Sequence, residues 1–281
     1  VPSVPYRLLQ QMLKRFDIED LGVTSAGLLN WSESAFASYI MSVERRIFTK
    51  KYGHLPGYRF LRLGLSPSQE TLDCFSQIHR FGVQSQVLGN IAEMSAAADF
   101  SDLPLPSEVV DVVLLQHSVE FSESPKASLN EALRVLSPGG HLIICVFNPV
   151  GPTGLIKFPM QLVTNRPQYR FHNLRKGRLI DWLTLLNCEV LDVDHGAYHW
   201  PRRLAAGASD GQKPLAMRED ISPWDNACEK IRLPVGNFYM IHAVKRVARG
   251  ISSSSRVWKR SVSGRLRSST AKPLGSKTES K

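Results

Sequence analysis

Residues 98–149 read ADFSDLPLPSEVVDVVLLQHSVEFSESPKASLNEALRVLSPGGHLIICVFNP, and this stretch decides the fold of the chain. It contains two short apolar runs, at residues 109–115 and 141–147. Each run is nearly continuous, which is typical of strands buried on both faces of a parallel sheet. A helical segment lies between them, so the stretch predicts one βαβ unit with a right-handed crossover.

The helix of this unit is marked at both ends. Ser124 is a residue type preferred as a helix cap, and Pro125 suits the first turn. Residues 138–140, Pro-Gly-Gly, stop the helix. Between these limits, apolar residues at helical spacing predict the side that lies on the sheet: Leu129, Ala132, Leu133 and Leu136.

Strand-like and helical segments alternate on both sides of this unit. We expect further strands at residues 58–63, 188–194 and 237–247. Another strand should lie within residues 77–87, and a short one should end at Asp99. Apolar helical faces are expected at residues 8–16, 36–47 and 179–186. Only 35 positions separate Gly64 from Asp99, so at least one crossover helix there must be shortened or lost. The alternation predicts an α/β fold built on an open sheet.

The chain divides into three predicted parts. Residues 1–50 should form N-terminal helices that pack on the core, and residues 51–248 the main domain. Within that domain, residues 149–175 show no clear period and are expected to form a functional loop or lid, and residues 196–234 are irregular. Residues 249–281 are basic and rich in serine, so we expect a disordered tail.

The basic charge is concentrated in that tail. The whole chain carries a formal net charge of +10, of which residues 249–281 contribute +8. The remaining residues hold 26 basic and 24 acidic side chains and are nearly neutral. We therefore expect only a weak, salt-sensitive contact of the tail with nucleic acid or anionic surfaces.

Composition argues against membrane and disulfide-stabilised classes. No apolar run approaches the roughly 18 residues of a membrane span, and the N-terminus lacks the layout of a signal peptide, so a cytoplasmic protein is expected. The four cysteines lie far apart and form no C-x-x-C pair, which indicates reduced thiols. His195 and His199 lack the acidic H-E-x-x-H context, so we expect no metal site.

The motifs of the deciding stretch resemble those of a known family. ADFSDLPLP, VVDVVLL, HSVEF, EALRVLSPGG and FNP follow one another as in class I S-adenosylmethionine-dependent methyltransferases, especially the ubiquinone/menaquinone-biosynthesis-like group and its divergent proteobacterial relatives. The later DWLTLLNCEVL is similar too, and the resemblance covers about residues 31–247. It implies a Rossmann-like, seven-stranded, mostly parallel sheet with an antiparallel last strand. S-adenosylmethionine would then lie across the carboxyl ends of the strands.

The resemblance also implies positions for the cofactor. Asp99 would receive the adenine amino group, and the Phe100 backbone would face the ring edge. Gln116 and His117, just past a buried strand, would lie near the methionine part and the methyl group. Gly64 would let the first loop approach the cofactor.

Several of these residues also have ordinary structural interpretations. Asp99 could simply cap the end of a strand, without binding a cofactor. Asp111 is better interpreted as a structural residue at the start of a strand. His117 and Glu120 become candidates for orienting a substrate or accepting its proton if the cofactor is bound. Asn148 and Pro149 are candidates for the substrate side, although Asn-Pro is also a common turn.

The first motif departs from the family pattern. Of the family's usual glycines, RLGLSPS keeps only Gly64, and Arg62 stands near the position where the family has an acidic residue. The acid that binds the ribose hydroxyls in the family has no clear counterpart, and Asp73 and Glu93 are the acids available nearby in the sequence. Two hypotheses follow. One is an enzyme that transfers a methyl group in line to an unknown acceptor, a small molecule or RNA. The alternative is a catalytically silent binding module whose basic tail contacts nucleic acid or a protein partner.

Overall fold

The computed structural model describes residues 28, 31–32, 34–65, 68–85, 95–164, 166–200 and 223–246. The chain divides into two units, residues 1–246 and 247–281, and the described residues lie in the first. The predicted helical face at residues 8–16, the tail at residues 249–281 and Glu93 lie outside the described residues. Among the described residues, no helix has both the length and the apolar character needed to cross a membrane.

The described strands form one seven-stranded sheet in the order β3-β2-β1-β4-β5-β7-β6. Parallel pairing joins β3 through β5, and β7 runs antiparallel to both β5 and β6. The predicted α/β fold with an antiparallel last strand is therefore confirmed. The strands are β1 (Arg59–Gly64), β2 (His79–Gln84), β3 (Ser95–Ala97), β4 (Val110–Gln116), β5 (Leu136–Phe147), β6 (Cys188–Gly196) and β7 (Phe238–Lys245).

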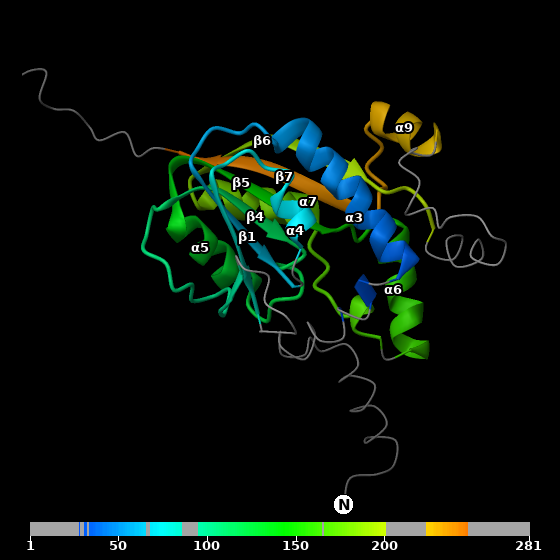
Figure 1. Ribbon diagram of the computed structural model, residues 1–281. Helices are drawn as coiled ribbons and strands as arrows, with labels where there is room; N and C mark the ends of the chain where they lie inside the picture. Colours follow the sequence, from blue (N-terminus) through cyan, green and yellow to red (C-terminus); the bar gives the residue numbers. More distant parts are fainter. Residues whose placement is uncertain are drawn as a thin grey trace, which may run out of the picture. The chain divides into compact units, whose positions relative to one another are not determined.

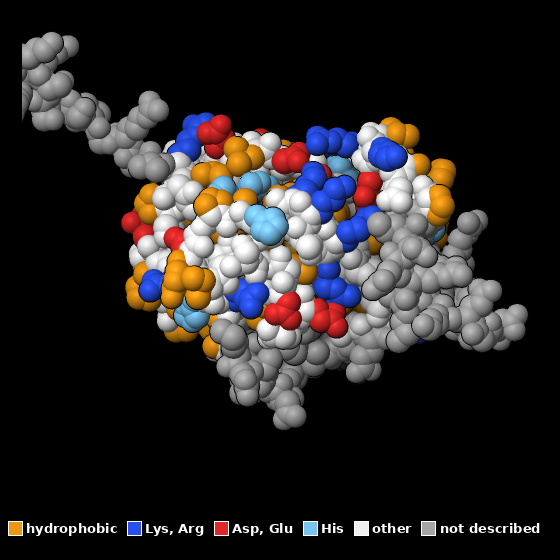
Figure 2. Space-filling model, turned by 45° about the horizontal axis from the view of Figure 1, so that its top comes forward, with side chains coloured by type: hydrophobic (Ala, Val, Ile, Leu, Met, Phe, Trp, Pro, Cys, Tyr) orange, Lys and Arg blue, Asp and Glu red, His pale blue; other side chains and the backbone are white. Residues whose placement is uncertain are grey.

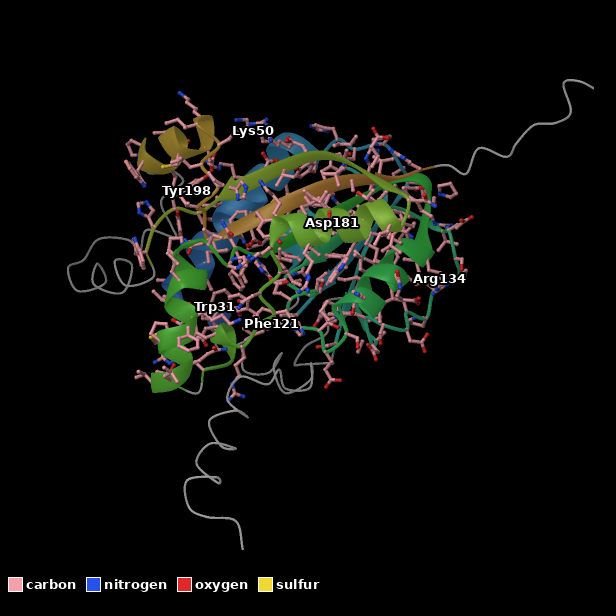
Figure 3. The ribbon with its side chains drawn as sticks, turned by 180° about the vertical axis from the view of Figure 1, so that it is seen from behind. Trp31, Lys50, Phe121, Arg134, Asp181 and Tyr198 are labelled. Atoms are coloured by element: carbon pink, nitrogen blue, oxygen red, sulfur yellow. The ribbon has the colours of Figure 1, made fainter. Side chains whose placement is uncertain are left out.

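Helices cover both faces of this sheet. Figure 1 shows α3 (Ala35–Ile47) and α4 (Gln69–Leu72) in front of the strands. From behind, Figure 3 shows α5 (Pro125–Val135) and α7 (Lys176–Leu185), the latter marked by Asp181, over the opposite face. The central strands are consequently buried on both faces, which is why they read as continuous apolar runs.

The compressed region forms as predicted, whereas the predicted helix end is wrong. The helix α5 ends at Val135 because Leu136 already has an extended backbone (φ −74°, ψ 130°), so Leu136 and residues 138–140 belong to β5. The crossover between β1 and β2 contains only the four residues of α4. Ser124 and Pro125 open α5, although the Ser124 side chain makes no cap hydrogen bond. Asp111 has the structural role: its Oδ2 accepts hydrogen bonds from the backbone N–H groups of Tyr58 and Arg59 at 2.7 and 3.0 Å. These bonds tie the start of β1 to β4.

Two predicted irregular segments are wrong in part. The stretch at residues 149–175 contains α6 (Pro152–Val163) and the short 3₁₀ turn η2 (Pro167–Tyr169), and residues 196–234 contain α9 (Pro223–Lys230). The buried residues of α6 are mostly polar (Thr153, Lys157 and Gln161), whereas the apolar Leu155, Phe158 and Val163 are exposed, so its pattern is the reverse of that of an ordinary amphipathic helix.

The surface of this unit carries charges of both signs. Figure 2 shows Lys and Arg side chains interspersed with Asp and Glu on the face it presents. Arg46 at the end of α3 pairs with Glu229 of α9, and Lys51 of the π-helix η1 (Phe48–Tyr52) lies 3.0 Å from Asp192 of β6. This mixture agrees with the nearly neutral charge expected of the chain without its tail.

Candidate functional site

The carboxyl ends of β1 and β4 meet at the point where the strand order reverses. Gly64 ends β1 and is paired in register with Gln116, which ends β4. From β1 the chain continues to β2 on one side, whereas from β4 it continues to β5 on the other. In open α/β sheets this reversal leaves a crevice beyond the strand ends, and ligands bind there.

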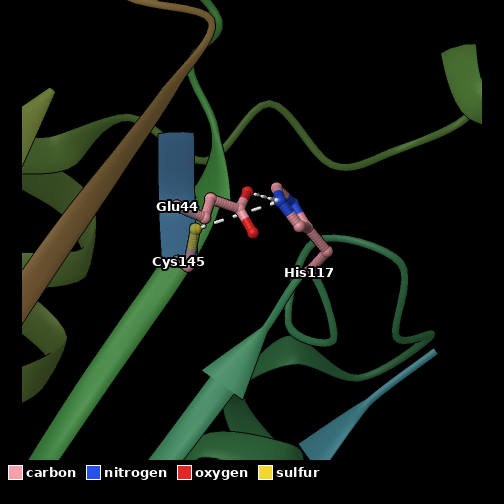
Figure 4. Close-up of side chains that lie close together, drawn as sticks. All are labelled: Glu44, His117 and Cys145. Carbon is pink, nitrogen blue, oxygen red and sulfur yellow. Dashed lines mark hydrogen bonds and ion pairs between the residues drawn. The ribbon is translucent and has the colours of Figure 1, made fainter. Parts of the chain in front are cut away.

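A buried polar cluster lies at this point, and α3 supplies its central carboxylate. Gln116 donates from Nε2 to Glu44 Oε2 at 2.6 Å, and His117 Nε2 lies 2.6 Å from Glu44 Oε1. Arg62 of β1 donates from Nε to Gln116 Oε1 at 2.7 Å. Figure 4 shows Glu44 and His117 facing each other, with Cys145 of β5 beside them. Glu44, Arg62 and Gln116 are all buried.

The electrostatics of this cluster favour an ion pair. Burial opposes the charge of Glu44, but the nearby His117 charge and the hydrogen bonds outweigh it and lower the pKa of this carboxyl. Burial likewise opposes the charge of His117, yet the Glu44 carboxylate raises the pKa of this imidazole well above its usual value. Burial lowers the pKa of Arg62 to about 10, against the pull of Glu44. His117 is therefore protonated and Glu44 ionised near neutral pH.

His117 is held from both sides. Its backbone adopts a left-handed conformation with φ of 50°, which is uncommon for a residue with a side chain. Its Nδ1 lies 2.8 Å from Glu120 Oε1, and this oxygen also accepts the Phe147 backbone N–H at 3.0 Å. The ring of Phe147 lies 4.3 Å from the imidazole, centre to centre. Both ring nitrogens of His117 thus already face carboxylates.

The Arg62 guanidinium packs directly against Gly64 in this structure. A Cβ atom placed on Gly64 would lie 2.7 Å from the Arg62 guanidinium, so the missing side chain leaves room for that group. The family resemblance would place the cofactor near this glycine, and the structure places the Arg62 guanidinium there.

Asp99 and Phe100 follow β3 at the same edge of the sheet. The Asp99 side chain is exposed, and its Oδ1 accepts the Ser101 backbone N–H at 2.8 Å. Phe100 is fully buried, so its ring belongs to the core and only its backbone could face a ligand. Asp99 thus caps a local turn and keeps its second carboxylate oxygen without a hydrogen bond to the described residues.

Asn148 and Pro149, the predicted substrate-side residues, have different surroundings. Asn148 is buried and donates from Nδ2 to the carbonyl oxygens of Pro234 and Gly236 at 2.9 and 3.0 Å. This amide holds the end of β5 against the segment before β7. Pro149 instead lines an open cavity of about 890 Å³ beside α6.

The structure brings together residues that the sequence analysis missed. Glu44 stands four positions after Ile40 and three before Ile47, so helical spacing alone would have placed this acid on the apolar face of α3. Lys157 and His172, which line the cavity beside α6, had no comparable signal because no regular period surrounds them.

One group among the described residues could offer ligands to a metal ion. The ligand atoms of Glu44, His117 and Cys145 lie within 4.8 Å of one another. Two of these residues already hydrogen-bond each other, and the Arg62 cation acts on Glu44, so the trio is satisfied as an ion-pair cluster.

The chain is similar to known methyltransferases in sequence. Residues 63–144, from the end of β1 into β5, match the family model described as a methyltransferase domain. The chain is 33% identical over 156 residues to the uncharacterized protein YafS of Escherichia coli K12, covering 54% of this chain and 61% of that protein. It is 39% identical over 51 residues to the demethylmenaquinone methyltransferase of Clavibacter sepedonicus, covering 18% and 21% of the two chains. The chain thus spans less than two thirds of the length of these curated relatives.

Solved structures share the fold. A methyltransferase from Thermotoga maritima, which depends on S-adenosylmethionine (SAM), superimposes with a TM-score of 0.54 at 17% identity, covering 78% of this chain and 96% of that chain. A SAM-dependent methyltransferase from Archaeoglobus fulgidus gives a TM-score of 0.51 at 16% identity, covering 78% and 99%. At these identities the likeness concerns the fold alone.

Proposed function

We propose that this protein, which belongs to the class I S-adenosylmethionine-dependent methyltransferases, binds S-adenosylmethionine at the carboxyl ends of β1 and β4 and methylates an acceptor held beside α6. The observation that carries this proposal is the match of residues 63–144, which include the ends of β1 and β4 and the turn after β3. The ends of β1 and β4 meet at the reversal of strand order, where open α/β sheets bind their ligands, and the turn after β3 lies at the same edge of the sheet, two strands from β1.

The residues at this edge fit the cofactor in chemical kind. The free oxygen of the exposed Asp99 carboxylate is an acceptor suited to the adenine amino group. The Arg62 guanidinium is suited to the carboxylate of the methionine part, because guanidinium and carboxylate pair through parallel hydrogen bonds. We propose these two residues as contacts of the cofactor.

The chain's contribution to the reaction is mainly positioning. When bound, S-adenosylmethionine supplies an electrophilic methyl group. Holding an acceptor in line with such a group can contribute roughly 7–11 kcal/mol without covalent protein chemistry. His117 is protonated and bonded at both ring nitrogens, so its contacts support a positioning role between Glu44 and Glu120 rather than the acceptance of a proton.

Calorimetry with S-adenosylmethionine tests the proposal. We expect micromolar binding by the intact chain, and Asp99→Ala should weaken it by roughly 10- to 100-fold, since a hydrogen bond to a charged group contributes about 1.5–3 kcal/mol. Glu189→Ala is the matched control, because Glu189 is also an exposed acid but lies on β6 at the far edge of the sheet. Absence of binding at millimolar concentration would reject the enzyme hypothesis.

The second candidate function is a methyltransferase-like binding module without catalysis. The position of the Arg62 guanidinium beside Gly64 favours it, because that group lies where the resemblance would let the cofactor approach the first loop. Its basic tail would then contact nucleic acid or a protein partner. This alternative predicts that the chain binds no S-adenosylmethionine, whereas removal of residues 247–281 abolishes partner binding.

A further inference from the structure

The cavity beside α6 adjoins the cluster at the strand ends. Its described lining includes Pro149 after β5, Lys157 and Phe158 on α6, and Phe171 and His172 after η2. Figure 3 shows Phe121, which follows β4, on the side of the sheet where α6 lies. A chain of ring contacts joins the two sites: Phe171 lies 5.4 Å from Phe147, and Phe147 lies 4.3 Å from His117, centre to centre.

Lys157 brings a buried positive charge to this cavity. Its side chain is only 7% exposed, and its Nζ donates to the Phe171 carbonyl and, at 2.8 Å, to Asn173 Oδ1. The same nitrogen lies 4.2 Å from the centre of the Phe171 ring. No carboxylate of the described residues forms an ion pair with Lys157. Because a buried cation without an opposite charge is costly, an anion from outside would stabilise it.

His172 brings an unused hydrogen-bond acceptor to the same cavity. Its backbone N–H donates to the Glu120 carbonyl at 2.7 Å, and its ring interacts with the backbone of Ser122. The ring Nε2 is buried and has no hydrogen-bond partner among the described residues. Burial lowers the pKa of this imidazole, and Lys157 acts in the same direction, so the ring is neutral near pH 7. A neutral imidazole with one nitrogen bonded to a carbonyl presents the other as a proton acceptor.

We propose that this cavity binds the methyl acceptor as an acidic small molecule, with its anionic group on Lys157 and its nucleophilic O–H or N–H on Nε2 of His172. This inference rests on the proposed methyltransferase function and names the substrate class. Arg175 at the rim adds a second cation, whereas Glu123 is the single acid among the described lining residues and disfavours a second anionic group nearby.

His172 is the proton acceptor in this arrangement. The proton of the acceptor's O–H or N–H bond passes to Nε2 of His172. The electron pair of that bond forms the new bond to the transferred methyl carbon, whose bond to sulfur breaks and leaves a neutral thioether. The acceptor and S-adenosylmethionine are the only reactants, and no oxidant or reductant is required.

Binding of matched probes to the intact chain tests the proposal without turnover. The probes are 4-hydroxyphenylacetate, its uncharged amide, and 4-methoxyphenylacetate, which lacks the donor. We expect the hydroxy acid to bind at least tenfold more tightly than either analogue in calorimetry. Lys157→Met should remove the preference for the acid over the amide, and His172→Phe the preference for hydroxy over methoxy. Lys126→Met is the control, since Lys126 lies over Trp182 of α7 and does not line the cavity.

A pH titration of the unmodified chain provides a second measurement if a variant fails to fold. Burial lowers the pKa of Lys157 to about 8, so affinity for the acid should fall above that pH while affinity for the amide stays constant. Equal affinity for acid and amide, or an unchanged preference in Lys157→Met, would overturn the proposal. The same samples are titrated with S-adenosylmethionine. Probe binding without cofactor binding rejects the methyltransferase function alone, and cofactor binding without probe preference rejects this inference alone.

Discussion

Replacement of Glu44 by glutamine should destabilise the fold by about 3 kcal/mol near pH 6. The Glu44 carboxylate is fully buried, and its Oε1 lies 2.6 Å from His117 Nε2. Two unit charges about 4 Å apart attract by about 4 kcal/mol at an effective dielectric constant of about 20. Loss of one partner from a buried ion pair typically costs about 3–5 kcal/mol, because the other charge is left without compensation. Glutamine keeps the shape and removes only the charge.

The effect depends on pH in a direction set by both partners. The pKa of Glu44 is lowered on folding, so its contribution is present above the unfolded value of 4.5 and is lost as pH falls through the folded value. The pKa of His117 is raised on folding, so its contribution is complete below 6.5 and is lost as pH rises through the folded value. The cost of Glu44→Gln should therefore be largest near pH 6 and shrink in alkaline solution.

Urea unfolding followed by circular dichroism, near pH 6 and near pH 10, measures this cost. Glu70→Gln is the control, because Glu70 is exposed and pairs with Arg45 at the surface, where such a pair contributes at most about 1 kcal/mol. His117→Asn, alone and combined with Glu44→Gln, completes a double-mutant cycle. A cost below about 1 kcal/mol at both pH values, or an equal cost at both, would refute the assignment of a protonated His117 beside an ionised Glu44.

Two further predictions concern glycines and a buried amide, each measured by urea unfolding. Gly177→Ala should stabilise the fold by about 0.5–1 kcal/mol, because Gly177 lies within α7 and a Cβ there meets no atom within 4 Å. Gly151→Ala should destabilise the fold by about 1–3 kcal/mol, because its Cβ would lie 2.1 Å from the Gly236 carbonyl oxygen. Equal effects of the two would contradict the contacts. Asn237→Ala should cost about 3 kcal/mol, since its amide donates to two main-chain carbonyls and accepts the Thr153 N–H; a loss below about 1 kcal/mol would count against this network.

The sheet could be predicted because its signals are local. The strands β4 and β5 lie at the centre, so their apolar runs are continuous, and Ser124 and Pro125, which open α5, are neighbours in sequence. The shortened crossover followed from the length of chain between Gly64 and Asp99. The antiparallel direction of β7 came from the family resemblance, since no feature of its own residues determines strand direction.

The site could be predicted only where it adjoins a strand end. Gln116 ends β4 and His117 follows it, and their placement at the switch point is a consequence of the fold. The helix α6 was missed because its buried side is mostly polar and its apolar side chains are exposed, and with it the cavity that it lines was missed. The environment of Lys157 depends on η2 and the residues after it, which pack back on α6.

The sequence by itself determined the α/β architecture, because strand periodicity, helix caps and chain length act over short distances. Only the tertiary structure decided the charge state at the carboxyl ends of β1 and β4. Glu44 and His117 are 73 residues apart in the chain, and Lys157 and His172 are brought to one cavity by the way α6 folds back. Burial and the distances between charged groups across the fold shift the pKa values of these side chains. The local sequence does not encode either of them.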